Sequence, residues 1–302
     1  MAAEQKKGLL PASMVSPAAA TMAGGLEILF FHPFDTVSKR LMSNQKSLFQ
    51  GNFLTNANKT IFKDYSDAGL VQKVKYLYPG SQFAIAYKIL QRVYKFAGQP
   101  IVRKQMEQAG VTDALKPVCG KRSKLMTESI AGSIIGIGEI VLLPLDRLKI
   151  LSQTNDAALK NRSLLSVFRA EGLGLYAGAG VTAMRNAPGS FSLFGGAAFT
   201  KEVIFGLEDF SKASVPQNLT ASAVGATLSI VVTNPMDVVK TRIQNKNFGE
   251  SVSGAQVVRS IMREEGPGAF FKAVGPKVSA TAPKVVCAYT LTEYFIHKLK
   301  AV

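Results

Sequence analysis

The sequence has few of the residues that build metal sites, disulfide frameworks and catalytic triads. It holds two cysteines, two histidines and no tryptophan among 302 residues. Cys119 and Cys287 are too few for a disulfide framework or a Cys-rich metal centre. His32 and His297 are too few for a histidine zinc site or a nucleophile–base–acid arrangement. We therefore expect no metal, no cofactor and no enzymatic activity.

Acidic residues are also scarce. Aspartate and glutamate total 20 against 36 lysines and arginines, which gives a formal net charge of +16. Only 19% of the residues are charged, whereas 47% are hydrophobic. These values exclude a disordered chain, which combines low hydrophobicity with high charge density. A basic but apolar chain of this length either handles anions or lies in a membrane, and it fits two or three units of about 100–150 residues.

Three apolar stretches have the length of membrane-spanning helices. Residues 17–34 carry Glu27 as their one acid, residues 125–145 carry Glu139 deep within them, and residues 215–236 carry no charge. An ionisable side chain that faces lipid is costly, so we expect these acids to line a water-filled path within a helix bundle. On hydropathy alone, amphipathic helices of a soluble protein remain the alternative.

The amino-terminal segment does not resemble a cleaved targeting peptide. It carries Lys6 and Lys7 without an apolar core and a small-residue cleavage site, and it is not an arginine-rich amphipathic segment. We therefore expect any targeting information to be internal.

A short motif recurs at or near the end of each apolar stretch. A proline is followed two residues later by an aspartate, and the copies are 111 and 91 residues apart. In the second and third copies a lysine and a glutamine follow the proline at offsets of five and nine residues. The first copy has Ser38 and Met42 at these offsets. The motif residues are Pro33, Asp35, Pro144, Asp146, Lys149, Gln153, Pro235, Asp237, Lys240 and Gln244.

A second recurring feature opens another apolar segment in each unit. These anchors end at Gly80, Gly178 and Ala273, each two residues after an aromatic side chain. Each unit therefore predicts a long helix, a connector with a short helix (for example residues 164–171) and a second long helix. The prolines at Pro33, Pro144 and Pro235 are expected to kink the first helix of each unit. We assign the units to residues 1–110, 111–212 and 213–302.

Together these motifs resemble the signature of the mitochondrial carrier family, over about residues 15–300. The resemblance implies an all-α membrane protein with six transmembrane helices in three pseudo-symmetric repeats and short matrix helices around a central cavity. It implies alternating access across the mitochondrial inner membrane. It further implies a monomer, with membrane lipids as partners and cardiolipin at the matrix-side helix ends.

The resemblance also implies a matrix gate, formed by charge pairs between neighbouring repeats. Asp35 would pair with Lys149, and Asp146 with Lys240, with Gln153 and Gln244 as braces beneath them. For Asp237 the matching base position holds Ser38, so either Lys39 or Arg40 reaches across or the gate has two pairs. The aromatic–acid pattern of a cytoplasmic gate is not evident near Phe96, Phe199 or Tyr294.

Four runs resemble more narrowly those family members that exchange the guanine nucleotides GTP and GDP. They are residues 32–44, 87–95, 136–144 and 185–191, and they include the serine in place of the first gate base. Guanine nucleotides are therefore the expected partners.

The second helix of each unit is rich in bases, which at membrane depth should face a wet cavity that concentrates anions. Counting seven residues past each anchor marks the cavity positions of the family, which include Tyr87, Lys88, Arg185 and Asn186. Arginine suits bidentate phosphate recognition and lysine supplies a point charge. We expect the phosphates to be bound by Lys88, Arg92, Arg185 and Lys284.

Three other side chains are candidates for contacts to the nucleoside. Asn186 would bind base or ribose, and Tyr87 either stacks on the purine or packs within the bundle. Glu139 either accepts hydrogen bonds from the guanine N1–H and amino group or pairs with a cavity base such as Arg185. The sequence leaves both alternatives open.

Two functions of other classes, a nucleotide-hydrolysing enzyme and a nucleic-acid-binding protein, are less well supported by the same residues. Residues 120–123 resemble the end of a phosphate-binding loop, but Leu115 replaces the first glycine and Arg122 the hydroxyl residue. A nucleic-acid-binding protein would account for the net charge, yet the bases are spread through apolar segments without a binding-module signature. A carrier of another phosphorylated or carboxylate anion remains a third possibility.

Overall fold

The computed structural model describes residues 12–46, 52–155, 159, 164–207, 212–248, 250 and 252–301. Every regular element within these residues is a helix. This confirms the all-α class that the carrier resemblance implies.

The described part of the chain forms seven longer helices, joined by shorter helices and single turns. The longer ones are α1 (Ala12–Ser43), α4 (Ser81–Gln108), α6 (Ser123–Gly138), α7 (Leu143–Thr154), α9 (Ala179–Phe199), α10 (Val215–Gln244) and α12 (Val274–Ala301). The shorter ones are α2 (Phe53–Phe62), α3 (Leu70–Lys75), α5 (Val111–Cys119), α8 (Leu164–Glu171) and α11 (Gly254–Glu264). The 3₁₀ turns are η1 (Lys63–Tyr65), η2 (Gly120–Arg122), η3 (Glu139–Leu142), η5 (Gly172–Tyr176) and η8 (Pro267–Phe271), and η6 (Thr200–Ile204) is a π-turn.

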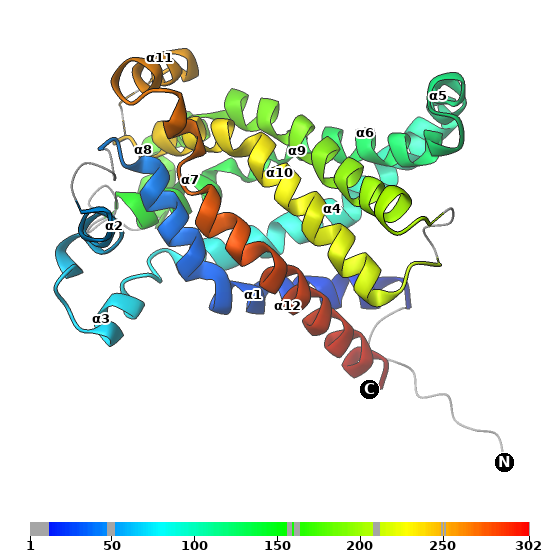
Figure 1. Ribbon diagram of the computed structural model, residues 1–302, viewed down its shortest axis with the longest axis horizontal. Coiled ribbons are helices and arrows are strands. Elements are labelled where there is room, and N and C mark those ends of the chain that lie inside the picture. The colour runs from blue at the N-terminus through cyan, green and yellow to red at the C-terminus, as the bar shows by residue number, and fades with distance from the viewer. Residues whose placement is uncertain are drawn as a thin grey trace.

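The longer helices pack side by side in a closed ring. Helix α1 contacts α4 and α12, α4 contacts α6 and α7, α9 contacts α6 and α10, and α10 contacts α12. Figure 1 shows these helices crossing one another along the length of the molecule. The ring places residues of the first and last parts of the chain next to each other, and it encloses the site described below.

The second helix of each predicted unit begins directly after a residue with left-handed backbone. Gly80 (φ +68°) precedes α4, Gly178 (φ +83°) precedes α9 and Ala273 (φ +69°) precedes α12. Glycine adopts this conformation without steric cost, whereas alanine does not. At Gly80 a side chain is excluded a second time, because its Cβ would lie 2.5 Å from the Cβ of Ser152 in α7. The recurring anchor in the sequence is thus a signal for the start of a helix.

The three motif prolines lie in different local structures. The α-helix runs continuously through Pro33 in α1 and through Pro235 in α10. At the second copy it is interrupted, since α6 ends at Gly138, η3 follows, and Pro144 lies in the first turn of α7. Proline suits the first turn because its missing N–H would have no intrahelical acceptor there. The interruption places Glu139, which is buried, at the turn between two helices.

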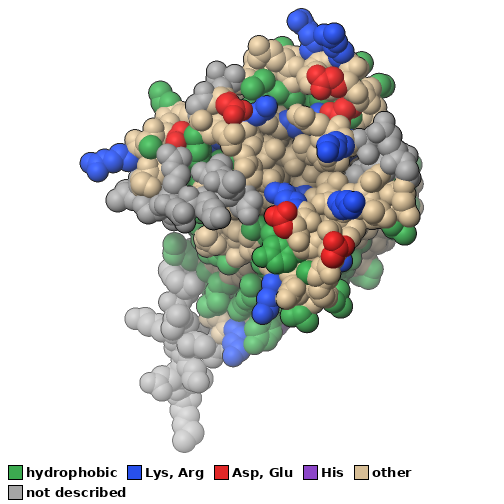
Figure 2. All heavy atoms as spheres, turned by 90° about the vertical axis from the view of Figure 1, so that its left-hand side faces the viewer, with side chains coloured by type: hydrophobic (Ala, Val, Ile, Leu, Met, Phe, Trp, Pro, Cys, Tyr) green, Lys and Arg blue, Asp and Glu red, His purple; other side chains and the backbone are tan. Residues whose placement is uncertain are grey.

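Four of the shorter helices gather at one end of the ring, whereas α5 lies at the other end (Figure 1). Helices α2, α3, α8 and α11 lie at the left of Figure 1, and α8 has the bounds that the sequence predicts for a connector helix. Helix α11 begins at a capping box, in which Gln256 N–H donates to Ser253 Oγ and the Ser253 N–H donates to the Gln256 side chain. Figure 2 shows this end face-on, with acidic and basic side chains distributed over it.

Two stretches of the described chain are long and apolar enough to cross a membrane. They are Ser129–Thr154, which comprises most of α6 with η3 and α7, and Val215–Gln244, which is α10. Helix α4 is long enough but carries Lys88, Arg92 and Lys95 within eight residues. Charged side chains lower the hydropathy of such helices below that of a simple membrane-spanning helix, and these side chains belong to the site inside the ring.

Candidate functional site: a charged cavity inside the helical ring

The ring encloses a cavity of about 360 Å³. This volume lies in the range of small-molecule sites, about 300–1,000 Å³. Among the described residues, seven lysines and arginines and five acids line it, so the bases exceed the acids by two. The charged lining residues are Glu27, Asp35, Lys39, Lys88, Glu139, Asp146, Lys149, Arg185, Asp237, Lys240, Lys277 and Lys284. Such a lining attracts anions.

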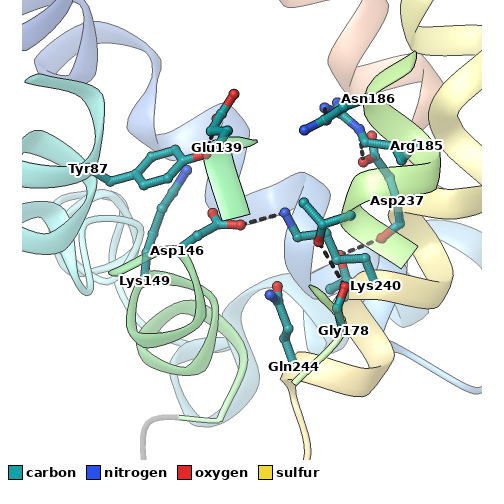
Figure 3. Close-up of polar contacts among 12 residues, drawn as sticks. Tyr87, Glu139, Asp146, Lys149, Gly178, Arg185, Asn186, Asp237, Lys240 and Gln244 are labelled. Carbon is teal, nitrogen blue, oxygen red and sulfur yellow. Dashed lines mark hydrogen bonds and ion pairs between the residues drawn. The ribbon is translucent and has the colours of Figure 1, made fainter. Parts of the chain in front are cut away.

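Two ion pairs join neighbouring helices at one end of this cavity. Lys149 of α7 donates to Asp35 of α1. Lys240 of α10 lies 2.5 Å from Asp146 of α7, and the two side chains are only 10% and 9% exposed (Figure 3). These contacts have the partners that the carrier resemblance implies for a matrix gate. Their opening and closing role stays a prediction.

The third motif aspartate has partners that the sequence did not suggest. Arg185 Nε donates to Asp237 Oδ1 at 2.8 Å, and Lys277 Nζ donates to Oδ2 at 2.7 Å. Lys39 donates instead to Thr241 Oγ1 at 3.2 Å. The structure therefore corrects the expectation for this pair: bases from α9 and α12 replace the Lys39 or Arg40 of α1.

Two arginines seven residues after a motif proline form a further layer of contacts. Arg40 Nε donates to the carbonyl oxygen of Gln153 at 2.8 Å, and Arg242 Nε donates to that of Met42 at 3.1 Å. Both carbonyls lie in the last turn of a helix, where they have no intrahelical donor. Each arginine thus joins the end of one helix to another.

Arg242 is oriented by an acid outside the apolar stretches. Glu265 accepts hydrogen bonds from both terminal nitrogens of Arg242, one of them at 2.9 Å, and from Lys272 at 2.6 Å. Partial burial raises the pKa of Glu265, but the hydrogen bonds from these two bases outweigh it and hold the pKa below its ordinary value. The acid is therefore ionised at neutral pH and keeps Arg242 in place.

The two motif glutamines are fully buried but bond away from the ion pairs. Gln153 Nε2 donates to Thr36 Oγ1 at 3.2 Å, and Gln244 Nε2 donates to the carbonyl oxygen of Ala177 at 3.5 Å. The expectation that they brace the lysine–aspartate pairs is corrected accordingly. In this structure Gln153 joins the end of α7 to α1, and Gln244 joins the end of α10 to the turn before α9.

Three of the expected phosphate-binding residues converge on one acid. Glu27 of α1 is 4% exposed and lies 3.3 Å from Lys88, 3.6 Å from Arg92 and 3.8 Å from Lys284. Lys88 and Arg92 are one turn apart on α4 and share a face, whereas Lys284 comes from α12. The structure brings the three bases together as the sequence suggests, with Glu27 between them.

A second polar cluster surrounds Glu139 at the start of η3. Tyr87 and Gln91 donate to its Oε1, and Lys95 Nζ lies 2.9 Å from its Oε2. The base paired with Glu139 is therefore Lys95, and the alternative of a pair with Arg185 is corrected. Figure 3 shows Tyr87 and Glu139 across the cavity from Arg185 and Asn186.

On the opposite wall of the cavity, Asn186 contacts both Arg185 and helix α6. Its Oδ1 accepts from Arg185 Nη1 at 3.1 Å, and its amide nitrogen donates to the carbonyl oxygen of Gly136 in α6. A Cβ at Gly136 would lie 3.3 Å from that of Asn186, so the glycine allows α6 and α9 to approach closely. Asn186 is thereby held at the cavity wall beside Arg185.

Sequence reasoning missed Gln91, Lys95 and Lys277 as parts of this polar network. Gln91 and Lys95 follow Tyr87 by four and eight residues, a spacing that places all three on one helix face and could have identified them. Lys277 lies in the first turn of α12, and only the packing of α12 against α10 brings it to Asp237. No spacing within the sequence signals that contact.

The sequence matches known proteins along most of its length. The family profile described as mitochondrial carrier protein matches residues 121–207 and 211–301. An uncharacterized mitochondrial carrier of Schizosaccharomyces pombe is 48% identical over 275 residues, 91% of this chain and 90% of the relative. The mitochondrial GTP/GDP carrier protein 1 of Saccharomyces cerevisiae is 48% identical over 275 residues, 91% of each chain. A mitochondrial substrate carrier family protein Z of Dictyostelium discoideum is 27% identical over 283 residues.

A closed ring of helices around a charged cavity, with stretches able to cross a membrane, is the architecture of a membrane transporter. The chain belongs to the mitochondrial carrier family. It is accordingly a transporter of a mitochondrial membrane. This membership sets aside the nucleotide-hydrolysing enzyme and the nucleic-acid-binding protein as alternatives.

Proposed function

We propose that the protein exchanges GTP and GDP across the mitochondrial inner membrane by alternating access through the charged cavity. The observation that carries the transport mechanism is the excess of bases in a cavity enclosed by the helical ring. The similarity to the Saccharomyces cerevisiae GTP/GDP carrier, which extends over 91% of both chains, supports the cargo.

The proposed architecture has three repeats, residues 1–110, 111–212 and 213–302. Each contributes two transmembrane helices, α1 with α4, α6–α7 with α9, and α10 with α12, and the short helices α2, α3, α8 and α11 lie on the matrix side. The ring of contacts and the repeated left-handed helix starts support this assignment. The protein acts as a monomer, and cardiolipin binds at the matrix-side helix ends.

In this proposal the ion pairs Asp35–Lys149 and Asp146–Lys240 close the matrix side, while Asp237 with its two bases completes the layer. Closure at one end leaves the cavity accessible from the other. Opening requires these pairs to separate, and their burial makes separation costly unless bound cargo compensates. An exchanger needs such coupling, because an empty carrier should rarely change state.

The phosphates bind the bases at the two sides of the cavity. GTP and GDP carry about four and three negative charges at neutral pH, and arginine forks and lysine point charges both complement phosphate oxygens. Lys88, Arg92 and Lys284 form one group of bases, and Arg185 lies on the opposite wall beside Asn186.

Guanine is selected by Glu139. The guanine N1–H and amino group are both donors that a carboxylate accepts, and adenine does not present the same pair. Gln91 and Tyr87 now occupy Glu139 Oε1, so the base would replace one of these neutral donors while Lys95 keeps the acid ionised. Tyr87 then lies where it can stack on the purine, and Asn186 contacts base or ribose.

The test of this selection is Glu139→Gln, an isosteric change that removes the charge and one acceptor oxygen. We expect the preference for GTP over ATP in exchange to fall by about tenfold or more, because a polar site that matches its ligand's donors discriminates strongly. Glu107→Gln is the control, since Glu107 is an exposed acid of the neighbouring helix α4. An unchanged GTP preference in a folded, active Glu139→Gln protein would exclude Glu139 as the selecting residue.

The proposed function is tested by uptake of labelled GTP into liposomes that contain the purified protein. The liposomes are preloaded with GDP, GTP, ADP or buffer alone. We expect uptake only with guanine nucleotide inside. Uptake into empty liposomes would contradict obligatory exchange. No uptake with any guanine preload, from folded protein, would remove the cargo assignment and direct the same assay to other phosphorylated or carboxylate anions.

A further inference from the structure

We propose that Glu27 is an internal counter-anion, whose carboxylate holds Lys88, Arg92 and Lys284 together until a nucleotide phosphate displaces it. The inference rests on the proposed function, since the displacing phosphate belongs to the cargo. It makes Glu27 a positioning residue that sets how tightly the cargo binds and how fast it leaves.

Three helices meet at this acid. Glu27 comes from α1, two of its bases come from α4 and the third comes from α12. Gly24, three residues before Glu27, lies on the same face of α1, and a Cβ there would be 3.4 Å from Arg92 Nε. A glycine at this position therefore lets the backbone of α1 approach the bases of α4, and the short distance brings the carboxylate within their reach.

The geometry of the cluster is looser than that of the gate. Its three nitrogen–oxygen distances are 3.3, 3.6 and 3.8 Å, whereas Lys240 and Asp146 are 2.5 Å apart. Glu27 Oε2 is buried and has no hydrogen-bond partner within the described part of the chain. A carboxylate that forms three long contacts and has no hydrogen bond to one of its oxygens is a weaker partner for these bases than a group with more acceptors.

The bases remain accessible while the acid is not. The side chains of Lys88, Arg92 and Lys284 are 22%, 31% and 40% exposed, against 4% for Glu27. Lys88 and Lys284 line the cavity together with Glu27. An anion that enters the cavity can therefore reach Lys88 and Lys284, whereas the Glu27 side chain is almost fully covered.

The charges of the cluster favour replacement of the acid by phosphate. Three bases around one carboxylate leave two positive charges without a counter-charge in the cluster. A terminal phosphate group offers three oxygens and close to two negative charges, so it matches the cluster better than a carboxylate does. Because phosphate would bridge α4 and α12, the contacts of both helices to α1 would weaken when cargo binds.

This arrangement predicts opposite effects on affinity and on turnover. Without a competing carboxylate the three bases would bind phosphate more tightly and release it more slowly. Glu27→Gln should therefore lower both the KM and the maximal rate of nucleotide exchange. A residue that only supports the fold would lower the amount of active protein and leave KM unchanged.

The first experiment measures the protection of the detergent-solubilised protein against thermal unfolding by inorganic tripolyphosphate, which contains no guanine. We expect Glu27→Gln to reduce the half-protecting concentration by about tenfold, a modest share of the Coulomb energy of one unit charge at these distances. Glu27→Asp keeps the charge and should stay within about twofold of the parent protein. Glu107→Gln, which removes an exposed acid of α4, is the matched control.

An unchanged or higher half-protecting concentration in folded Glu27→Gln protein would overturn the proposal. If that variant does not fold, the same protection is measured on Lys284→Gln, because this change removes the most exposed of the three bases. The proposal then requires weaker protection by tripolyphosphate, and equal protection overturns it. Failure of GTP exchange in the parent protein, together with the expected tripolyphosphate response, would remove the guanine cargo and leave the role of Glu27 standing.

Discussion

The sharpest consequence of the structure concerns the buried ion pair between α7 and α10. In Asp146→Asn the side chain keeps its shape but loses its charge, while Lys240 remains 10% exposed and 2.5 Å from the altered group. Removal of one member of a buried pair typically costs about 3–5 kcal/mol, because the remaining charge is left without compensation. This cost falls on the conformation described above, in which the pair is formed.

The assay is thermal unfolding of the purified protein in detergent. With about 2–4 °C per kcal/mol for a chain of this order of size, the unfolding temperature should fall by about 10 °C. Asp113→Asn is the matched control, because Asp113 pairs with Lys116 on α5 and both side chains are more than half exposed. Exposed pairs contribute little to stability, so the control should unfold with the parent protein.

A double variant separates the lost pair from the stranded charge. Asp146→Asn with Lys240→Gln removes both charges, and it should recover at least half of the loss in unfolding temperature. The reasoning fails if Asp146→Asn unfolds no earlier than Asp113→Asn. It fails equally if the double variant is as unstable as the sum of the two single variants.

Three further predictions concern the backbone, the gate and the pH dependence. Gly80→Ala should destabilise by about 3 kcal/mol and Gly178→Ala by about 1 kcal/mol, because only the first Cβ collides with α7 in addition to the strain of positive φ. Equal losses in thermal unfolding would contradict this. Ser38→Lys, which restores the missing motif base, should lower the unfolding temperature rather than raise it, because Asp237 already has two bases and Ser38 is buried. A rise would show that the gate lacks a pair. Because the folded pKa of Glu265 is lowered, its stabilising contribution is complete above the ordinary pKa of about 4.3 and is lost as pH falls through the lower folded value. Between pH 6 and 3 the parent protein should therefore lose more thermal stability than Glu265→Gln, and parallel losses would exclude the acid.

Local rules account for the parts of the site that the sequence predicts. The proline–aspartate–lysine spacing led to the partners Asp35–Lys149 and Asp146–Lys240 through the family resemblance, and the structure contains both contacts. The anchors at Gly80 and Gly178 were recognised as recurring points before long segments, and their positive φ values explain why glycine recurs there. Such features are carried by a few residues close together in the chain, so a repeated pattern reveals them.

Contacts between helices that are far apart in the sequence cannot be predicted from such local patterns. Asp237 was expected to seek a base in α1, yet Arg185 of α9 and Lys277 of α12 hold it. Glu139 was expected either to bind guanine or to pair with Arg185, and its base is Lys95 of α4. The base that pairs with each acid is the one whose long, flexible side chain lies nearest to it. These distances depend on how the helices cross.

The sequence by itself determined the helical class, the recurring proline–aspartate motif and the abundance of bases within apolar segments. It did so because helix starts, proline positions and hydrophobic runs are local properties of the chain. Only the tertiary structure decided that Lys88, Arg92 and Lys284 share one acid, Glu27. Closure of the ring brings α12 beside α1 and α4, and the charges of residues more than 250 positions apart then fall within 4 Å of one another. The charge pattern along the chain indicates which residues can form ion pairs, whereas the distances between helices decide which of them do.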